Sequence, residues 1–402
     1  MGACSLGLGW RTVSACLLSL VLADDTVLTH PTESRYSTFG RAVGHADIDA
    51  DGHLDLVIGA SADGDGDGYD NGAVYLFSGG GDGFGAGSRL AASDEHHGTD
   101  SNLFGFGVAT SDINGDGFND LQVGAPGYQW GTGAVYLFAG GQDGIDPSTE
   151  QRLMLTDEWD LDTYFGSYLS GGADINGDGL DDLLVGDRVY LGATGELAEP
   201  IPLDVTFMTM PGDLNGDGYA DLAGYASPFD TDPDGYYVLF GDSSGTAGTA
   251  PAFVSGPNRG FGWNITGAGD FDGDGFDDLA MLDLEGGAYV VAGTADGTPT
   301  DRLLHVEEEG LDWFVDIAGG VDFDKDGLDD VFVAAGRSSY EGPGLAGADV
   351  FYGGGGSELI FAIDDCESPE CFATAEGLPD VDGDGFDELA LGTYLSPEAG
   401  QT

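Results

Sequence analysis

Positive charge is what this sequence lacks most. Its 402 residues contain 10 Lys plus Arg against 73 Asp plus Glu, and Lys325 is its single lysine. Proteins that bind nucleic acid through phosphates need a basic surface, and binding to an anionic membrane needs clustered basic residues. The net charge of −63 therefore excludes both classes of partner. Long hydrophobic runs are also missing, so no transmembrane segment is predicted.

The N-terminal segment is the one place where an apolar stretch follows a basic residue. Arg11 precedes an apolar stretch at residues 13–22, and small residues around Ala23 suit a cleavage site. This order is typical of a secretory signal peptide. We therefore predict a signal peptide at residues 1–23 and a mature chain at residues 24–402, which is secreted or displayed at the cell surface.

Cysteine is scarce, with four in the whole chain. Cys4 and Cys16 lie in the predicted signal peptide, which leaves Cys366 and Cys371 in the mature chain. A metal site built on this pair would need a second pair of ligands nearby, which the sequence does not supply. Since cysteines of secreted proteins usually pair, we predict a disulfide between Cys366 and Cys371.

The sequence is rich in glycine and aspartate, arranged in a repeated pattern. Its 73 glycines follow no collagen period, which favours turn-rich β structure, and a hydrophobic content of 41% is enough for a core. One nonapeptide, typified by DINGDGFND, occurs seven times and predicts a repeat architecture. The seven copies begin at Asp47, Asp112, Asp174, Asp213, Asp270, Asp322 and Asp380.

Short strands are predicted around each nonapeptide. Runs such as GAVYLF at residues 72–77 and again at 133–138 are rich in β-branched and aromatic residues and lie between turns. Counting the strand that leads into each nonapeptide gives four per unit. The sequence therefore predicts an all-β fold, a seven-bladed β-propeller of four-stranded antiparallel blades.

The last blade is expected to be closed by the N-terminus. Residues 26–30 are similar to the fourth strands of other units, so they are predicted to form the outer strand of the seventh blade. Because the sequence ends soon after Glu388, we expect this blade to lack its third strand, as in a C-terminally truncated propeller.

Further motifs surround the nonapeptides. Phe-Gly pairs stand before four of them, at residues 39–40, 104–105, 165–166 and 261–262, and Gly-Ala-Pro follows one at 124–126. The fourth unit lacks the pair, and the sixth has Trp313-Phe314 instead. The pattern resembles the FG-GAP repeat of the integrin α-subunit N-terminal propeller and its secreted microbial relatives. The resemblance implies that the face opposite the nonapeptides carries the ligand contacts.

The nonapeptides have the composition of cation-binding loops. Oxygens at positions 1, 3, 5 and 9 and a backbone carbonyl at position 7 can surround a hard cation, and glycine at position 6 permits the turn. Calcium suits such loops better than magnesium, which demands a stricter octahedron. The predicted ligands are Asp47, Asp49, Asp51, His53, Asp55, Asp112, Asn114, Asp116, Phe118, Asp120, Asp174, Asn176, Asp178, Leu180, Asp182, Asp213, Asn215, Asp217, Tyr219, Asp221, Asp270, Asp272, Asp274, Phe276, Asp278, Asp322, Asp324, Asp326, Leu328, Asp330, Asp380, Asp382, Asp384, Phe386 and Glu388.

An EF-hand is excluded, because position 12 holds residues such as Ile58 and Met281 in place of an acidic ligand. We expect about seven structural Ca²⁺ ions that relieve the repulsion among carboxylates. A further acidic run has two interpretations, a flexible acidic loop or an extra site. It consists of Asp63, Asp65, Asp67 and Asn71.

The tryptophans of the mature chain all map to loops on the side opposite the predicted calcium loops. They are Trp130, Trp159, Trp263 and Trp313. Exposed aromatic residues suit recognition of an extracellular protein or a glycan. The alternative is that these side chains cap the channel or pack between blades.

Two functions remain open at this point. The first is a non-catalytic adhesion or ligand-binding module, and the second is an extracellular hydrolase or polysaccharide lyase, since propellers also support catalysis. His96 and His97, beside Asp94 and Glu95, are the local cluster that could serve as a catalytic base. No nucleophile motif accompanies them, and His45 and His53, which flank the first loop, look structural.

Overall fold

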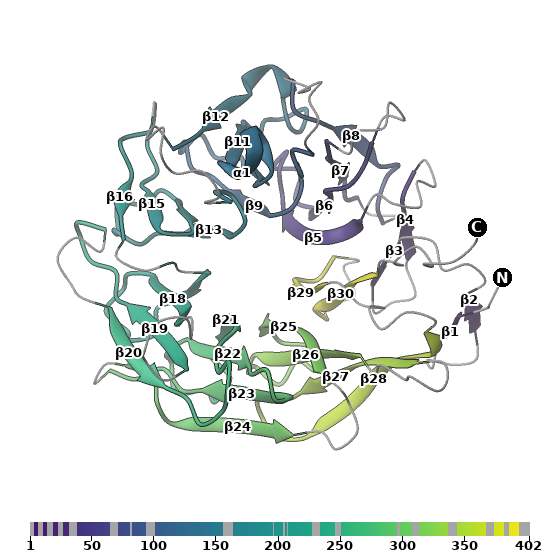
Figure 1. The fold of residues 1–402 in the computed structure, drawn as a ribbon, viewed down its shortest axis with the longest axis vertical. Helices are drawn as coiled ribbons and strands as arrows, with labels where there is room; N and C mark the ends of the chain where they lie inside the picture. Colours follow the sequence, from purple (N-terminus) through teal and green to yellow (C-terminus); the bar gives the residue numbers. More distant parts are fainter. Residues whose placement is uncertain are drawn as a thin grey trace.

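The computed structural model describes most of the chain from residue 38 onward, together with short N-terminal segments. The described residues are 4–6, 11–13, 19–22, 27–31, 38–64, 71–80, 83–93, 101–155, 164–195, 197–203, 206, 208–226, 234–245, 251–295, 298–307, 313–336, 344–366, 374–381 and 386–393. Their strands form six four-stranded antiparallel sheets and one six-stranded sheet. Figure 1 shows the sheets arranged as a ring around a central axis, which is a β-propeller.

Three of the four-stranded blades come from residues 39–202. The first consists of β5 (Phe39–Ala46), β6 (Asp55–Ala60), β7 (Ala73–Phe77) and β8 (Ser88–Leu90). The second consists of β9 (Val108–Ser111), β10 (Asp120–Ala125), β11 (Ala134–Phe138) and β12 (Gln151–Leu153), with α1 (Tyr128–Gly131) and the 3-10 helix Pro147–Thr149 in its loops. The third consists of β13 (Leu169–Ala173), β14 (Asp182–Val185), β15 (Arg188–Tyr190) and β16 (Ile201–Pro202).

The next part of the ring contains two more blades and the six-stranded sheet. One blade consists of β17 (Thr209–Gly212), β18 (Asp221–Ala226), β19 (Gly235–Leu239) and β20 (Ala252–Ser255). Its neighbour consists of β21 (Asn264–Gly269), β22 (Asp278–Leu282), β23 (Gly287–Val291) and β24 (Arg302–Glu307). The six-stranded sheet consists of β25 (Trp313–Val321), β26 (Asp330–Gly336), β27 (Gly344–Phe351), β28 (Ser357–Cys366), β1 (Cys4–Leu6) and β2 (Arg11–Val13).

The last blade combines the two ends of the chain, in the order β29 (Thr374–Leu378), β30 (Glu388–Thr393), β3 (Ser19–Leu22) and β4 (Val27–Thr29). The prediction that the N-terminal segment forms the outer strand is confirmed, because β4 is at the outer edge. For the 402-residue chain, the prediction that this blade lacks a strand is wrong, since β3 pairs with both β30 and β4. The sequence count missed β3 because its residues lie inside the predicted signal peptide.

The prediction of seven uniform four-stranded blades is also wrong, since six blades have four strands. The remaining sheet gains β1, where Ser5 pairs with Asp364 of β28, and β2 pairs with β1 in turn. Removal of residues 1–23 stays a prediction, as does the disulfide. Cys371 lies outside the described residues, and Cys366 is the last residue of β28.

The core lies between neighbouring sheets. The innermost strand of each sheet contacts that of the next, and β29 contacts β5, so the ring is closed. Phe104 of a Phe-Gly pair is buried against Tyr136 of β11, with ring centroids 5.3 Å apart. Gly105 must be glycine, since its φ is +88° and a Cβ would lie 2.4 Å from the carbonyl oxygen of Ala73. The Phe-Gly pair therefore joins adjacent blades.

The described helices are short. None of them has the length and apolar character that crossing a membrane would require.

Candidate cation loops and the opposite face

The nonapeptides, numbered loop 1 to loop 7 in chain order, all connect the innermost strand of a sheet to its second strand. Loop 1 follows β5 at Ala46 and leads into β6 at Asp55. Asp47 begins the turn, because its two carboxylate oxygens accept hydrogen bonds from the backbone N–H groups of Asp51 (3.0 Å) and Gly52 (2.9 Å). Gly52 has φ +89°, which glycine adopts without strain. Positions 1, 5 and 6 are thereby held together.

The acid at position 9 anchors each loop to its sheet. Asp221 is fully buried and accepts hydrogen bonds from the N–H of Leu214 at position 2 and of Gly241 beyond the third strand, both at 2.9 Å. Four more position-9 acids accept the two equivalent hydrogen bonds in their own repeats, from the N–H at position 2 and from a glycine N–H beyond the third strand. They are Asp55, Asp182, Asp278 and Asp330.

Burial perturbs these position-9 carboxyl groups. It raises the pKa of Asp221 and Asp278 to about 7, and the charges of neighbouring loop aspartates add to the effect. The same causes raise the pKa of Asp120, Asp182 and Asp330 to about 6. Ionising these groups in the folded state is costly unless a cation is present to offset the charge.

Among the described residues, three loops bring their carboxylates into one group. In loops 1, 5 and 6, one oxygen from each of positions 1, 3 and 9 lies within 4.8 Å of the others. In loop 5, the Oδ1 atom of Asp270 is buried and has no hydrogen-bond partner. An acidic group with an unsatisfied buried oxygen fits a divalent cation, because hard cations prefer carboxylate ligands.

The loops with asparagine at position 3 are arranged differently. Asn176 and Asn215 each donate from the side-chain amide to the position-5 aspartate, Asp178 (3.0 Å) and Asp217 (3.1 Å) respectively. In both loops the amide hydrogen bond therefore occupies one oxygen of the position-5 carboxylate. In loop 7, Glu388 is buried and accepts the N–H of Val381 at 2.8 Å, while residues 382–385 lie outside the described part of the chain.

Sequence reasoning gave no role to position 8 of the loops. Four loops have an aspartate there, Asp181, Asp277, Asp329 and Asp387. In the structure each of these carboxylates contacts the preceding loop. The sequence does show an aspartate at position 8, outside the ligand positions. Its hydrogen-bond partner, the position-1 aspartate of the preceding loop, is far away along the chain.

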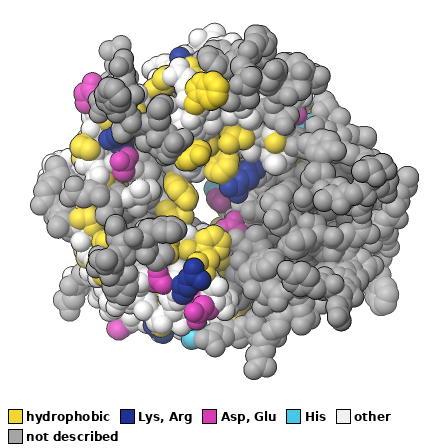
Figure 2. Space-filling model, in the orientation of Figure 1, with side chains coloured by type: hydrophobic (Ala, Val, Ile, Leu, Met, Phe, Trp, Pro, Cys, Tyr) yellow, Lys and Arg dark blue, Asp and Glu magenta, His cyan; other side chains and the backbone are white. Residues whose placement is uncertain are grey.

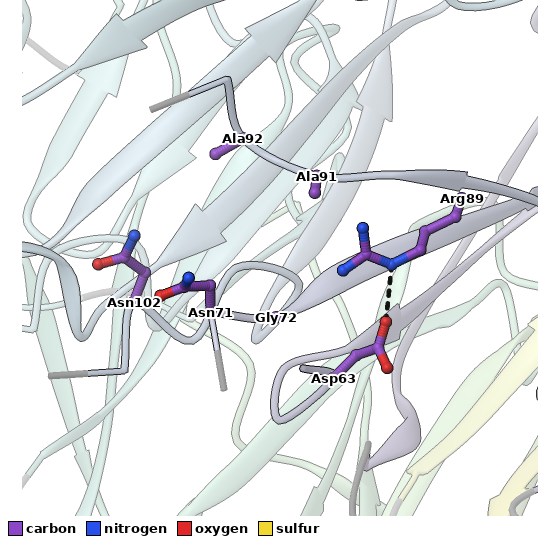
Figure 3. A pocket seen from close by; sticks show the side chains of 7 residues that line it. All are labelled: Asp63, Asn71, Gly72, Arg89, Ala91, Ala92 and Asn102. Carbon is purple, nitrogen blue, oxygen red and sulfur yellow. Dashed lines mark hydrogen bonds and ion pairs between the residues drawn. The ribbon is translucent and has the colours of Figure 1, made fainter. Parts of the chain in front are cut away.

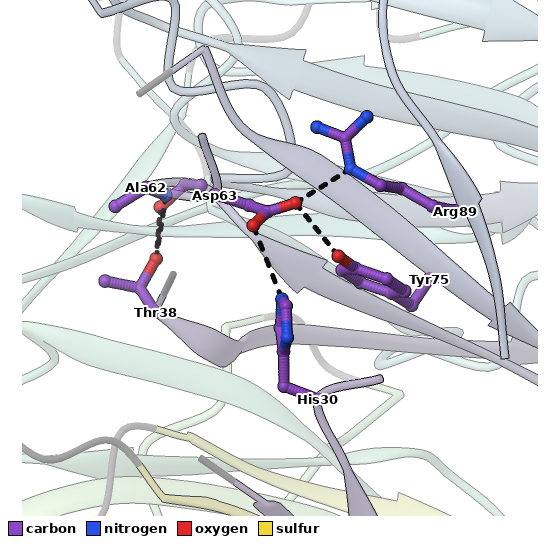
Figure 4. Close-up of polar contacts among 7 residues, drawn as sticks. His30, Thr38, Ala62, Asp63, Tyr75 and Arg89 are labelled. Carbon is purple, nitrogen blue, oxygen red and sulfur yellow. Dashed lines mark hydrogen bonds and ion pairs between the residues drawn. The ribbon is translucent and has the colours of Figure 1, made fainter. Parts of the chain in front are cut away.

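The additional acidic run contains one buried structural residue. Asp63 accepts hydrogen bonds from Arg89 Nε (2.8 Å) and Tyr75 Oη (2.9 Å), and its other oxygen lies 3.4 Å from His30 Nε2, as Figure 4 shows. Burial alone would raise the pKa of Asp63, but the contacts with His30, Arg89 and Tyr75 outweigh it and lower the pKa. Asp63 is therefore committed to packing between the first blade and His30, which follows β4 of the last blade.

Next to this cluster lies a small cavity of about 10 Å³, lined by Arg89, Asn71 and Asn102 among others (Figure 3). That volume is close to the space of one water molecule. The interpretation of the acidic run as an extra cation site is not supported for Asp63, and Asp65 and Asp67 lie outside the described residues.

The face opposite the loops carries exposed aromatic residues. Trp130 is 70% exposed, and Tyr164 and Tyr168 are about half exposed. Trp130 and Gln129 are both left-handed, with φ values of +67° and +46°, and Tyr164 has φ +50°. Such backbone conformations cost non-glycine residues free energy and are concentrated at binding sites. Figure 2 shows hydrophobic side chains around the central opening.

The other tryptophans predicted for this face are half-buried or lie outside the described side chains. Trp263 is half-buried and packs against the hydrophobic cluster that includes Ile317 and Val331, which matches the packing interpretation. Trp313 is the first residue of β25, and its side chain is outside the described part of the structure. Trp159 lies outside the described residues, as do His96 and His97.

One histidine contact lies on the innermost strands. His45 Nε2 of β5 is 3.7 Å from a carboxylate oxygen of Glu376 on β29. These side chains are 27% and 40% exposed, but the surrounding innermost strands desolvate them. Desolvation lowers the pKa of His45 and raises the pKa of Glu376, which is also near Asp316. Both shifts favour the uncharged forms, so the contact is not a strong ion pair. Asp316 is itself held by the N–H of Ala375 (2.8 Å) and the amide of Asn264 (2.6 Å).

Comparison with known proteins identifies the repeats. A family model described as the FG-GAP repeat matches residues 39–77 and 104–138. Integrin alpha-PS5 of Drosophila melanogaster is 37% identical over 162 residues, which cover 38% of this chain and 16% of that protein. Integrin alpha-X of Mus musculus is 37% identical over 163 residues, covering 38% of this chain and 13% of that protein. The chain thus spans a small fraction of the length of the curated relatives it matches.

Two solved structures share the fold at low sequence identity. The BP39L lectin from Burkholderia pseudomallei has a TM-score of 0.57 and 15% identity, covering 90% of this chain and 98% of the lectin. BBS1N in complex with ARL6DN has a TM-score of 0.52 and 10% identity, covering 95% and 99%. The chain therefore carries FG-GAP repeats in a β-propeller similar to the N-terminal propeller of integrin α subunits.

Proposed function

We propose that this chain is a secreted, calcium-stabilised, non-catalytic adhesion or ligand-binding module. The observation that carries the proposal is the combination of FG-GAP repeats with acidic loops on one face of the propeller and exposed aromatic residues on the opposite face. Its relatives in the comparison are integrin α subunits, and the propeller of the lectin BP39L shares its fold.

Calcium acts in this proposal as a structural cofactor at about seven sites. The three acidic groups, the buried unpaired oxygen of Asp270 and the raised pKa values of Asp221 and Asp278 support it. At each of these places a bound cation would stabilise carboxylate groups in their charged form. The free energy of cation binding would then contribute to folding stability.

The ligand, in this proposal, is an extracellular protein or a glycan that contacts the face opposite the loops. Trp130, Tyr164 and Tyr168 give this face a group of aromatic anchors. The neighbouring segments are joined by the hydrogen bond from the N–H of Tyr164 to the carbonyl of Gly131, at 2.8 Å. This hydrogen bond fixes the backbone near Trp130 and Tyr164, which reduces the conformational entropy lost when a ligand binds.

Screening glycan and protein arrays identifies the ligand, and Trp130→Ala then tests the face. We expect the affinity for the identified ligand to fall at least about tenfold, because truncating a central aromatic anchor costs roughly 2 kcal/mol or more. The melting temperature should stay nearly unchanged, since the side chain is 70% exposed. Phe253→Ala, an exposed aromatic on the outer strand β20, is the matched control. Equal binding by the two variants would contradict this assignment of the ligand face.

A further inference from the structure

The calcium loops are not separate in space, because the residue at position 8 of one loop reaches the loop before it. Four such carboxylates accept the backbone N–H of the position-1 aspartate of the preceding loop, at distances between 2.6 and 2.9 Å. The pairs are Asp181 with Asp112, Asp277 with Asp213, Asp329 with Asp270, and Asp387 with Asp322. Asn119 of loop 2 uses its amide instead and donates to the carbonyl of Asp47 at 3.2 Å.

A second contact joins the same neighbours. The side chain at position 7 covers the glycine at position 4 of the preceding loop, so that a Cβ on Gly216 would lie 2.4 Å from the ring of Phe276. The equivalent glycines of three other loops are covered in the same way. In loop 6 the glycine is replaced by Lys325, whose Nζ lies 3.8 Å from the ring centroid of Phe386. Neighbouring loops are therefore packed as well as hydrogen bonded.

The series of side-chain links is interrupted twice. Position 8 is Ala220 in loop 4 and Leu54 in loop 1, and neither side chain can accept or donate a hydrogen bond. Loops 3 and 4 keep the backbone hydrogen bond from Ala220 N–H to the carbonyl of Asp174, at 3.1 Å. The links thus divide the loops into two runs, loops 1 to 3 and loops 4 to 7.

We propose that position 8 couples cation binding between adjacent loops, so that the loops respond to calcium as these two runs. This inference rests on the proposed function of the loops. Position 8 lies between two ligand positions, the carbonyl at 7 and the carboxylate at 9. A cation that orders those ligands also fixes the position-8 carboxylate, which in turn holds the position-1 aspartate of the loop before it.

Two opposing effects set the sign of this coupling. The first cation reduces the negative potential at the neighbouring loop, which weakens binding of the second cation. Salt screens this electrostatic effect over about 8 to 10 Å at ordinary ionic strength. The hydrogen bond acts at contact distance and pre-orders a ligand. Charge is common to every pair of adjacent loops, whereas the position-8 link is not. A comparison across the break at Ala220 therefore separates the two effects.

The test measures the calcium midpoint of each loop separately, by amide hydrogen exchange of its peptide at graded calcium concentrations. Asp274→Asn disables position 5 of loop 5, and we expect the midpoint of loop 4 to rise about fivefold, as for a coupling at the lower end of the usual range. Asp217→Asn is the matched change in loop 4, and the midpoint of loop 3 should stay within about twofold, since the link to loop 3 is missing.

The link itself is tested in a double-mutant cycle. Asp277→Ala should raise the loop 4 midpoint, and adding Asp274→Asn should change it little further. Asp277→Asn keeps an acceptor oxygen without the charge, and should retain part of the coupling. Ala220→Asp installs the missing carboxylate, so that Asp217→Asn should now raise the loop 3 midpoint.

Equal effects of Asp274→Asn and Asp217→Asn on their neighbours would show coupling by charge alone and would overturn the proposal. No effect of either, or an Ala220→Asp variant without coupling, would overturn it too. These results differ from failure of the proposed function, in which the unmutated chain would show no calcium-dependent protection at its loops.

Discussion

Removing calcium is expected to lower the melting temperature of this protein on the order of 20 °C. A cation at one hundred times its dissociation constant contributes about 2.7 kcal/mol per site, and the proposed sites act together on one ring. A stability change of 1 kcal/mol moves the melting temperature of a domain of this size by roughly 1 to 2 °C. The loss is large because the freed loops keep three or four carboxylates in close proximity, as in the group Asp322, Asp324 and Asp330.

Differential scanning calorimetry with excess chelator, followed by calcium or magnesium, measures this effect. Calcium should restore the melting temperature more fully than magnesium, since the loops offer irregular oxygen ligands and no strict octahedron. Adding sodium chloride at matched ionic strength is the control, because general screening also relieves repulsion in a chain of net charge −63. Full recovery by salt alone would attribute the effect to screening instead of specific binding.

Acidification is expected to stabilise the calcium-free protein between pH 7.5 and pH 5. Burial raises the pKa of Asp221 and Asp278 to about 7, well above the ordinary value of 3.8. The folded state therefore binds protons more tightly than the unfolded state, and the free energy of unfolding falls as pH rises through this window. Lowering the pH from about 7 to 5, two units below the pKa of these groups in the folded state, corresponds to about 3 kcal/mol per group. Acidification should therefore raise the melting temperature by several degrees.

Calcium should change this pH dependence. Protons and calcium compete for the same position-9 carboxylates, so the stabilisation by calcium should shrink on going from pH 7.5 to pH 5. Below about pH 3.8 the trend reverses, because the pKa of Asp63 is lowered and its contacts with Arg89 and Tyr75 are lost on protonation. Melting curves of decalcified and calcium-loaded protein give both trends, and a calcium-free protein that becomes less stable between pH 7.5 and pH 5 would contradict the account.

The repeat itself predicted much of the architecture. The run GAYVV at residues 287–291 coincides with β23 (Gly287–Val291), and the loops lie between the first and second strands as their order along the chain requires. The closing role of residues 26–30 was predicted as well, from their similarity to the fourth strands. Period and local composition determine the strands and the loops, and the closing strand could be predicted because residues 26–30 are similar to the repeat.

Features whose distant partners are not marked by the repeat could not be predicted. β3 (Ser19–Leu22) has an apolar sequence that suits a signal peptide and a strand equally, and its pairing with β30 is not marked in that sequence. Asp63 belongs to an acidic run in the sequence, but Arg89 of β8 and His30, which follows β4, surround it in the structure. Asp277 likewise looks like one acid among many until Asp213 is placed beside it.

The most direct test of the central claim counts the calcium bound to each chain. Decalcified protein would be equilibrated with calcium at physiological ionic strength, dialysed against a calcium-buffered solution and analysed by mass spectrometry for metal and protein. We expect about seven calcium ions per chain, one for each acidic loop. A result of none or one would contradict the account, since the loops would then be acidic turns that fold without cations.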